Sequence, residues 1–487
     1  MSFNTFEMLF LFIPIALVTY WPLVKRGKAD WAMRLVSLET LVFYAVSYYK
    51  STPIFLVSLG LNYFFISKIF TSLKSKRWMI AGVVFDILLL CVQKYTPLIF
   101  EGFTIEATGI SYYTFCEIAL VVESYRKTIK KIDFTEYSFW MVFFPKIMQG
   151  PIMVPDTKSD NIYPKGKSKI DAETIFRAVM LFTFGLFKKV IIADTLAAVA
   201  SFGYDNPNAI HTGEALIIVL SYGFQVYFDF TGYCDMGMGI AALFGIELPV
   251  NFNSPFKAKS IEDFWKRWHI TLTKFFTKYL YIPLGGNRKG KARMYLNFMI
   301  VFMVSALWHG VGINFIIWGI LHGGMYVITR FVRMRHEEKY ADRTKKEYGP
   351  VLGRIIHVFK VALTFLFINV TWIFFGEPTL ESAMRYISSL GEWWFPRLSQ
   401  GLANCFNIDE LWYVIKVAGL DKWEYGIYIL PVVILVVLTI IIFFAPNSIQ
   451  YSGKCKINIW NTLLVAVLLI WSIMSMNGVA SYVYMNF

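Results

Sequence analysis

The sequence predicts an all-α membrane protein that crosses the bilayer many times. Of its 487 residues, 56% are hydrophobic and only 16% are charged. Apolar runs of membrane-spanning length recur over almost the whole chain, and a span needs roughly 20 mostly apolar residues. We therefore expect one membrane domain, residues 1–487, with roughly 11–14 helices. The longer apolar runs hold either two spans or one span with a re-entrant piece.

Each predicted helix corresponds to an apolar segment between polar connections. The segments are Thr5–Val24, Leu35–Tyr49, Thr52–Phe70, Trp78–Tyr95, Gly109–Tyr125, Phe139–Val154, Ile175–Phe202, Ala215–Gly245, Met294–Thr329, His357–Phe375, Tyr425–Phe444 and Ile457–Met474. The first of them has no positive residues before it and no small-residue cleavage site after it. It is therefore predicted to be a retained span and not a signal peptide.

The charge pattern predicts how the chain lies in the membrane. The formal net charge is +14, which we attribute to cytoplasmic loops and anionic lipids, not to nucleic acid. Three basic clusters, Lys25–Lys28, Lys74–Arg77 and Arg126–Lys131, are separated by pairs of spans. Positive loops stay inside, so the clusters are predicted to be cytoplasmic and the N-terminus external. The absence of an organellar targeting sequence fits a bacterial inner membrane.

The cysteines predict neither a disulfide framework nor a metal centre. They are scattered, odd in number and form no CxxC pair: Cys91, Cys116, Cys234, Cys405 and Cys455. Cysteines in apolar spans usually serve as small packing residues.

Three more polar stretches interrupt the membrane pattern. Pro155–Asp171 is predicted to be a simple connector, and Arg330–Gly349 a solvated, charged helix or loop. Residues 376–423 are moderately polar and aromatic, with Trp393, Trp394 and Phe395 near the centre. Because Trp and Tyr favour the membrane–water boundary, this connection is expected at the bilayer surface, as an anchor or as a contact for a partner.

A basic, aromatic segment runs from Lys257 to Arg293. It carries ten Lys or Arg residues against two acids. On a continuous helix, Phe264, Trp268, Phe275 and Tyr279 would share one face and leave cations for lipid headgroups or phosphates. This pattern is typical of a helix lying in the interface.

The segment ends in a glycine turn with fixed cations, Gly285-Gly286-Asn287-Arg288-Lys289-Gly290. Backbone amides in such turns, together with Arg and Lys, suit phosphate oxygens. The spacing is not that of a Walker loop, so the turn indicates a phosphorylated donor only when other observations support it.

Three histidines lie in or beside apolar segments. His309 is the strongest candidate for chemistry, because an imidazole inside a span is costly unless it faces a polar cavity or a partner. His269 follows Trp265 by four residues and would share a helical face with it. His322 fits the usual interpretation of a hydrogen-bonded structural histidine, although it could also line a tunnel.

Buried acids allow two interpretations. Asp229 and Asp235 stand in an apolar segment, where a carboxylate either lines an aqueous tunnel or neutralises a cation within the bundle. The residues alone leave both open.

Several motifs together resemble the membrane-bound O-acyltransferase family, in its bacterial alginate and peptidoglycan acetylation branch. The motifs are Trp265-Lys266-Arg267-Trp268-His269, Tyr279–Arg288, Leu307-Trp308-His309-Gly310, Phe144–Pro151, Lys188–Asp194 and Tyr227–Tyr233. The resemblance implies a ring of helices with re-entrant pieces around a thin central tunnel, and a core at about 109–330. It implies that His309 is the near-invariant family histidine and His269 the less constant second one.

The function that this resemblance implies is acyl transfer. Acetyl-CoA would enter from the cytoplasm as substrate, with no further cofactor. The acetyl group would pass to an envelope polysaccharide, to a lipid-linked acceptor, or to an extracytoplasmic partner resembling SGNH hydrolases. His309 would be the general base or relay and His269 an assistant, and the residues near the donor would be Asn287, Arg288, Lys289, Trp265 and Trp308.

Two alternatives remain at this point. The same fold could transfer D-alanine to teichoic acid, although the Tyr279–Arg288 motif favours the acetyl branch. A proton-coupled transporter could also use buried acids and histidines. Transporters often show internal repeats with paired broken helices, and this sequence has no such repeat.

Overall fold

The computed structural model describes most of the chain. The described residues are 3–100, 104–155, 170–205, 210–339, 349–377, 379–406 and 425–476, with Ile408, Tyr413, Lys416, Val417 and Gly419. Most of the predicted connector Pro155–Asp171 lies outside them. Residues 340–348 of the charged stretch and much of the aromatic connection after 406 also lie outside.

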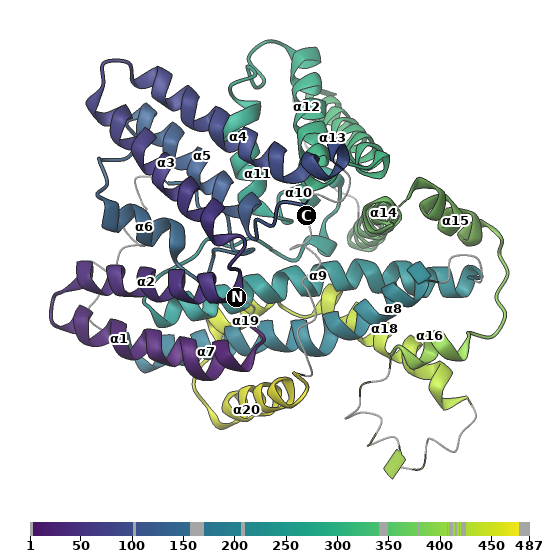
Figure 1. Ribbon diagram of the computed structural model, residues 1–487. Helices are drawn as coiled ribbons and strands as arrows, with labels where there is room; N and C mark the ends of the chain where they lie inside the picture. The colour runs from purple at the N-terminus through teal and green to yellow at the C-terminus, as the bar shows by residue number, and fades with distance from the viewer. Residues whose placement is uncertain are drawn as a thin grey trace. The chain divides into compact units, whose positions relative to one another are not determined.

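The described elements are helices (Figure 1), and the chain divides into two compact units. Unit 1 comprises residues 1–190, 230–250 and 448–487, and unit 2 comprises residues 191–229 and 251–447. Helix α9 (Thr212–Leu243) contributes its first part to unit 2 and its second part to unit 1. The all-α prediction is confirmed.

Unit 1 contains the N-terminal helices and the C-terminal pair. Its helices are α1 (Ile13–Lys25), α2 (Ala29–Ser47), α3 (Thr52–Thr71), α4 (Ser75–Ile99), α5 (Ile110–Arg126), α6 (Phe134–Val142), α7 (Ala172–Phe187), α19 (Ser448–Lys454) and α20 (Ile459–Met474). A short π-helical piece, Met8–Phe12, precedes α1. Local sequence explains some boundaries: α6 begins at a capping box in which Asp133 and Glu136 bond each other's backbone N–H.

The basic connections of unit 1 gather at one end. Lys127, after α5, donates to the carbonyl of Ile69 near the end of α3 (3.4 Å). Arg34, early in α2, donates to Thr135 at the start of α6 (3.0 Å). At the other end of α2, the hydroxyl of Tyr44 donates to the carbonyl of Thr108 (2.7 Å). The α1–α2, α3–α4 and α5–α6 connections therefore share one end, as the charge alternation requires.

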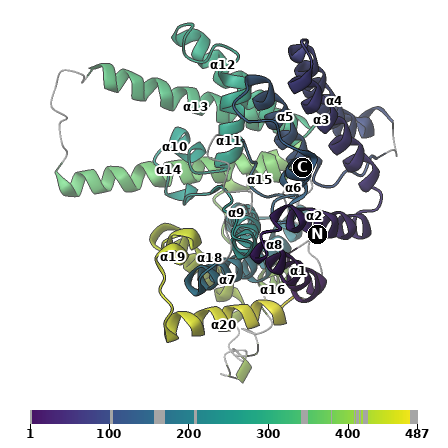
Figure 2. The same cartoon turned by 90° about the vertical axis from the view of Figure 1, so that its left-hand side faces the viewer.

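Unit 2 contains the segments singled out in the sequence. Its helices are α8 (Asp194–Asp205), α10 (Ile261–Trp265), α11 (Ile270–Phe276), α12 (Lys291–His309), α13 (Ile313–Lys339), α14 (Pro350–Gly376), α15 (Leu380–Gly391), α16 (Gln400–Asn404) and α18 (Gly426–Phe444). Helix α12 packs along α13, and α13 runs beside α14 (Figure 2). The predicted segment Met294–Thr329 is thus two helices that turn back on each other directly after His309.

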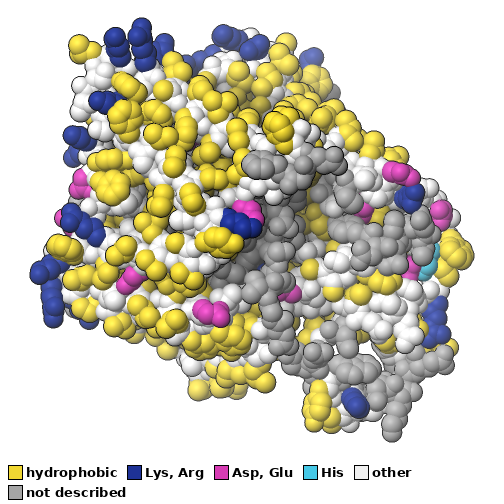
Figure 3. Space-filling view, viewed as in Figure 1, with side chains coloured by type: hydrophobic (Ala, Val, Ile, Leu, Met, Phe, Trp, Pro, Cys, Tyr) yellow, Lys and Arg dark blue, Asp and Glu magenta, His cyan; other side chains and the backbone are white. Residues whose placement is uncertain are grey.

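Seven of the described helices are long and apolar enough to cross a membrane. On most of them apolar side chains remain exposed, as on α4, where Ile80, Val84, Ile87, Leu88 and Val92 are about half exposed. Figure 3 shows hydrophobic side chains spread over the face that carries α3 and α4, with Lys and Arg at its edge. An apolar surface of this extent is stable against lipid, not water.

One predicted span is wrong. Phe139–Val154 was expected to be a single apolar helix, but α6 ends at Val142 and the following residues form turns and extended chain. Pro145 and Pro151 explain the break, because each removes a backbone donor and disfavours helix in the residue before it. The segment is buried all the same.

Close packing of α12 on α13 depends on a glycine. A Cβ added at Gly319 would lie 2.7 Å from the Cβ of Ala306, whereas one added at Gly324 would meet nothing within 4 Å. We predict that Gly319→Ala destabilises the protein by about 1–3 kcal/mol through overpacking, while Gly324→Ala does not. Thermal unfolding of both purified variants tests this, and equal midpoints would contradict it.

Candidate active site

His309 is the last residue of α12, and its ring orientation is fixed from within the helix. Its Nδ1 lies 2.7 Å from the backbone oxygen of Ser305, one turn earlier. A carbonyl oxygen only accepts, so Nδ1 carries the proton and donates it. In the neutral ring Nε2 then holds the lone pair. The His309 side chain is therefore set as a base at Nε2, and the residue is 2% exposed.

Aromatic rings from three helices surround His309. Ring centroids lie at 4.4 Å for Trp308 of α12, 5.2 Å for Trp318 of α13 and 5.2 Å for Phe375 of α14. Trp318 also contacts His322 (4.7 Å), which in turn contacts Trp265 of α10 (5.6 Å). Such rings limit the rotation of the imidazole and provide a setting of low polarity, where charge interactions are stronger than in water.

His269 lies at a break between two short helices, not on a continuous one. It precedes α11 with a left-handed backbone (φ 45°), and α10 has already ended at Trp265. The prediction that Trp265 and His269 share a helical face is therefore wrong. So is the prediction of a continuous helix with its aromatic side chains on one lipid-facing side, because Phe264, Trp268 and Phe275 are buried within the protein. These large rings are paired with other rings of unit 2, for instance Phe264 with Trp372.

Asn251 holds His269 and the start of α11. The side-chain oxygen of Asn251 accepts from the backbone N–H of Thr271 (3.2 Å) and from its hydroxyl (2.9 Å), which fixes the amide orientation. The same oxygen lies 3.2 Å from Nδ1 of His269, so that nitrogen is the donor. Burial lowers the pKa of His269 to about 3, which keeps the ring neutral at physiological pH.

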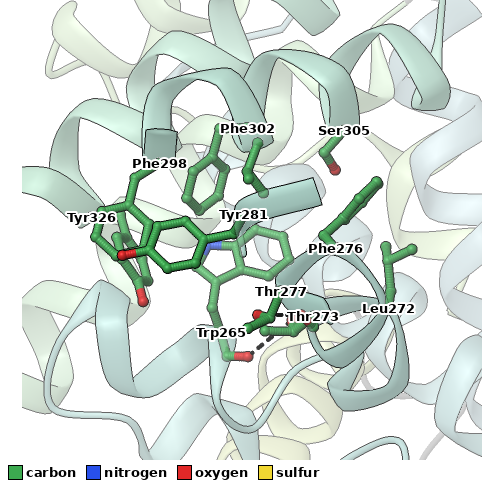
Figure 4. A pocket seen from close by; sticks show the side chains of 11 residues that line it. Trp265, Leu272, Thr273, Phe276, Thr277, Tyr281, Phe298, Phe302, Ser305 and Tyr326 are labelled. Atoms are coloured by element: carbon green, nitrogen blue, oxygen red, sulfur yellow. Dashed lines mark hydrogen bonds between the residues drawn. The ribbon is translucent and has the colours of Figure 1, made fainter. Parts of the chain in front are cut away.

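A cavity of about 70 Å³ leads to the helical turn that holds His309. Its lining includes Trp265, Tyr281 and Tyr326, and Ser305. Figure 4 shows the rings of Tyr281, Phe298 and Tyr326 gathered at one end and Ser305 at the other. The cavity is far smaller than the roughly 300–1,000 Å³ of a pocket that encloses a drug-sized ligand. It therefore suits a narrow group and not a whole nucleotide.

The predicted donor-binding turn starts at the wall of this cavity. Tyr281 lines the cavity, and the N–H of Gly286 donates back to the carbonyl of Tyr281 (3.0 Å). Asn297 of α12 pins the turn by donating to the carbonyl of Gly286 (2.9 Å). Asn287, Arg288 and Lys289 are exposed. The structure thus brings these three residues, with Trp265, to the same region of unit 2.

A carboxylate clamps α10 onto α13. Glu262 is 3% exposed and lies 2.9 Å from Arg330, 2.9 Å from Arg333 and 3.1 Å from Lys266. Both arginines belong to α13, so the ion pairs fix α10, and with it Trp265, against the helix that carries Trp318 and His322. Breaking a buried ion pair leaves an unpaired charge, which is strongly destabilising.

The remaining predicted site residues have structural partners or lie apart. His322 lies 2.8 Å from the hydroxyl of Thr371, which itself donates to backbone oxygens of α14. Asp235, in unit 1, pairs with Lys188 (2.6 Å) and bonds to Ser448. Asp229 is buried in the part of α9 that belongs to unit 2. A tunnel-lining role for these three residues stays a prediction.

Sequence reasoning missed the residues that hold the histidines. Ser305 had a usable signal, because a residue four positions before His309 lies directly beneath it on a helix. Asn251 and Phe375 had none, since they lie 18 and 66 positions from the histidines they contact. Only the tertiary fold brings them together.

Comparison with known proteins assigns the family. The sequence profile of the membrane-bound O-acyltransferases matches residues 17–371, from within α1 to within α14. The chain belongs to the membrane-bound O-acyltransferase family. It is an acyltransferase. The match extends beyond both ends of the predicted core at 109–330.

The named relatives are of two kinds, O-acetylating enzymes and D-alanyltransferases. A peptidoglycan O-acetyltransferase of Helicobacter pylori is 34% identical over 429 residues, which is 80% of this chain and 79% of the relative. A probable alginate O-acetylase of Pseudomonas fluorescens is 31% identical, over 86% of this chain and 82% of the relative. A teichoic acid D-alanyltransferase of Bacillus subtilis is 28% identical, over only 55% of this chain and 69% of the relative.

The Asn251 contacts predict a large effect of a small change. Asn251→Ala leaves buried donors of His269 and Thr271 without their acceptor, which costs about 1–3 kcal/mol for each unpaired group. We expect a lower unfolding temperature and slower acyl transfer. The matched control is Asn404→Ala, at an exposed position of unit 2. A wild-type midpoint and rate for Asn251→Ala would contradict this account of the His269 site.

Proposed function

We propose that this acyltransferase moves an acetyl group from cytoplasmic acetyl-CoA to a hydroxyl of a bacterial cell-envelope polysaccharide, directly or through a partner protein. The observation that carries the proposal is the 2.7 Å bond from Nδ1 of His309 to the Ser305 carbonyl. It leaves Nε2 as the basic nitrogen, one helical turn from a narrow cavity lined by Ser305.

In the direct route His309 first accepts a proton from the acceptor hydroxyl and then donates it to the leaving sulfur of CoA. Nε2 takes the proton of the acceptor hydroxyl while that oxygen attacks the acetyl carbonyl carbon. The carbon–sulfur bond then breaks, and the departing CoA sulfur takes the proton from Nε2. The products are an O-acetyl ester and CoA, and His309 returns to its neutral form.

The proposed donor path follows the cavity. The acetyl thioester and its slender arm would lie between Trp265, Tyr281 and Ser305, with Trp308 beside the reacting imidazole. The CoA phosphates would meet Asn287, Arg288 and Lys289 outside. His269 would hold the α11 side of this path, since its buried neutral ring is a positioning group and not a second acid.

The proposal also assigns an orientation in the membrane and partners on each side of it. The basic end of unit 1 would face the cytoplasm of a bacterial inner membrane, and acceptor polymer would approach from the other side. An extracytoplasmic protein resembling SGNH hydrolases would complete transfer to the polymer where transfer is not direct. The names of the relatives support peptidoglycan or an alginate-like polymer as the acceptor.

D-alanyl transfer to teichoic acid is the second candidate, because relatives bearing that name match part of the chain. The longer match to O-acetyltransferases favours acetyl transfer. Supplying purified protein with acetyl-CoA or with a D-alanine-loaded carrier protein distinguishes the two donors.

Replacing the base tests the chemistry. We expect His309→Gln to lower acetyl transfer by about 10²–10⁴-fold, the usual contribution of a general base. The control is His336→Gln, at an exposed position of α13, which should transfer acetyl at the wild-type rate. The measurement is CoA release with acceptor present, and wild-type turnover in His309→Gln would overturn the assignment.

Replacing the cations tests the donor site. The double change Arg288→Ala and Lys289→Ala should raise KM for acetyl-CoA roughly threefold to tenfold, as expected for two exposed ion pairs, with little change in kcat. The effect should shrink as salt is added, because salt screens exposed charges. Lys28→Ala, in an exposed loop of unit 1, is the control. An unchanged KM at low salt would refute this phosphate site.

A further inference from the structure

A second, much smaller cavity lies at the end of α14. Its volume is about 10 Å³, and it is lined by residues of α9, α14 and α15 together with Glu377. A cavity needs roughly 10–15 Å³ to hold one water molecule. The space therefore matches a single water and excludes a larger ligand.

Three residues on the lining of this cavity carry buried polar atoms. The atoms are Oδ1 of Asn369, Oε2 of Glu377 and the hydroxyl of Tyr386, on residues that are 3%, 5% and 3% exposed. Among the described residues, none lies within hydrogen-bonding distance and geometry of these atoms. Leaving a buried polar group without a partner is destabilising, so three such groups on the lining of one cavity indicate a bound molecule.

The donor and acceptor pattern fits water. The amide of Asn369 is oriented because its Nδ2 donates to the carbonyl of Phe365 (2.8 Å), which leaves Oδ1 as an acceptor. One water can donate to Oδ1 of Asn369 and to Oε2 of Glu377 and accept from the hydroxyl of Tyr386. Three hydrogen bonds are typical of a buried water.

This cavity lies next to the part of α14 that contacts His309. Glu377 follows directly after α14, and its backbone oxygen accepts from Nδ2 of Asn314 at the start of α13 (2.9 Å). Two residues earlier, Phe375 contacts the ring of His309 (5.2 Å) and the ring of Phe315 (5.4 Å). An interaction that fixes the position of Glu377 therefore also fixes Phe375, which packs against the His309 ring.

We propose that Asn369, Glu377 and Tyr386 bind one buried water molecule, and that this water makes Glu377 a positioning residue for His309. Loss of this water would loosen the end of α14 and let Phe375 move away from the His309 imidazole. Small displacements at a reacting group cost up to about 10²-fold in rate. The catalytic part of this inference rests on the proposed role of His309, whereas the water site does not.

The kinetic test uses full-length protein and variants that change one partner of the water. Tyr386→Phe removes the hydroxyl and Glu377→Leu removes the carboxyl, and each should lower kcat roughly 10- to 100-fold with KM for acetyl-CoA within twofold of wild type. Glu377→Gln keeps an oxygen acceptor and should retain most of the activity. Controls are Tyr49→Phe and Glu381→Gln, both at exposed positions.

The outcomes separate this inference from the proposed function. Wild-type kcat in Tyr386→Phe, or equal loss in Glu377→Gln and Glu377→Leu, would overturn the positioning role. An experimental density map of the wild-type protein should show one peak bonded to all three side chains, and an empty or collapsed cavity would overturn the water site. Should His309→Gln keep full turnover, the proposed function fails, while the density map still decides on the water.

Discussion

The proposed active site depends on one hydrogen bond, from Nδ1 of His309 to the backbone oxygen of Ser305. Both residues belong to α12, so the bond holds as long as the helix does and needs no other part of the chain. It chooses between two tautomers of nearly equal energy and directs the basic nitrogen away from the helix that carries it. In apolar surroundings that choice is hard to reverse, because the other tautomer would place the lone pair of Nδ1 against the carbonyl oxygen of Ser305.

In unit 2 the rings of three helices surround that imidazole, and a narrow cavity reaches Ser305, one turn earlier on α12. Trp318 of α13 and Phe375 of α14 contact the ring from helices that run side by side. The ion pairs of Glu262 hold α10 on α13 and so place Trp265 at the cavity. Rings provide shape and low polarity while a few charges fix the helices, an economical division of roles in a membrane, where each buried polar group needs a partner.

Much of the fold and of the candidate site could be predicted from the sequence, and the predictions that failed did so for identifiable physical reasons. Helix class, most helix boundaries and the basic ends of unit 1 follow from hydropathy and charge, which act locally. His309 stands out because an imidazole in an apolar helix is costly. The break at His269 was not predicted, because a left-handed residue between two short helices is stabilised by Asn251, 18 residues away. The span predicted at Phe139–Val154 failed because hydropathy alone does not distinguish a buried, non-helical apolar segment from a membrane-spanning helix. The prolines in this segment were not given enough weight.

The proposed role of His309 requires a neutral ring with its proton on Nδ1, and the two ring nitrogens report this directly. Histidine labelled with ¹⁵N in the full-length protein in lipid bilayers gives separate signals for the two nitrogens, and the His309→Gln spectrum assigns them. At pH 7 we expect a protonated Nδ1 and an unprotonated Nε2. A proton on Nε2, in either the other tautomer or an imidazolium, would contradict the account.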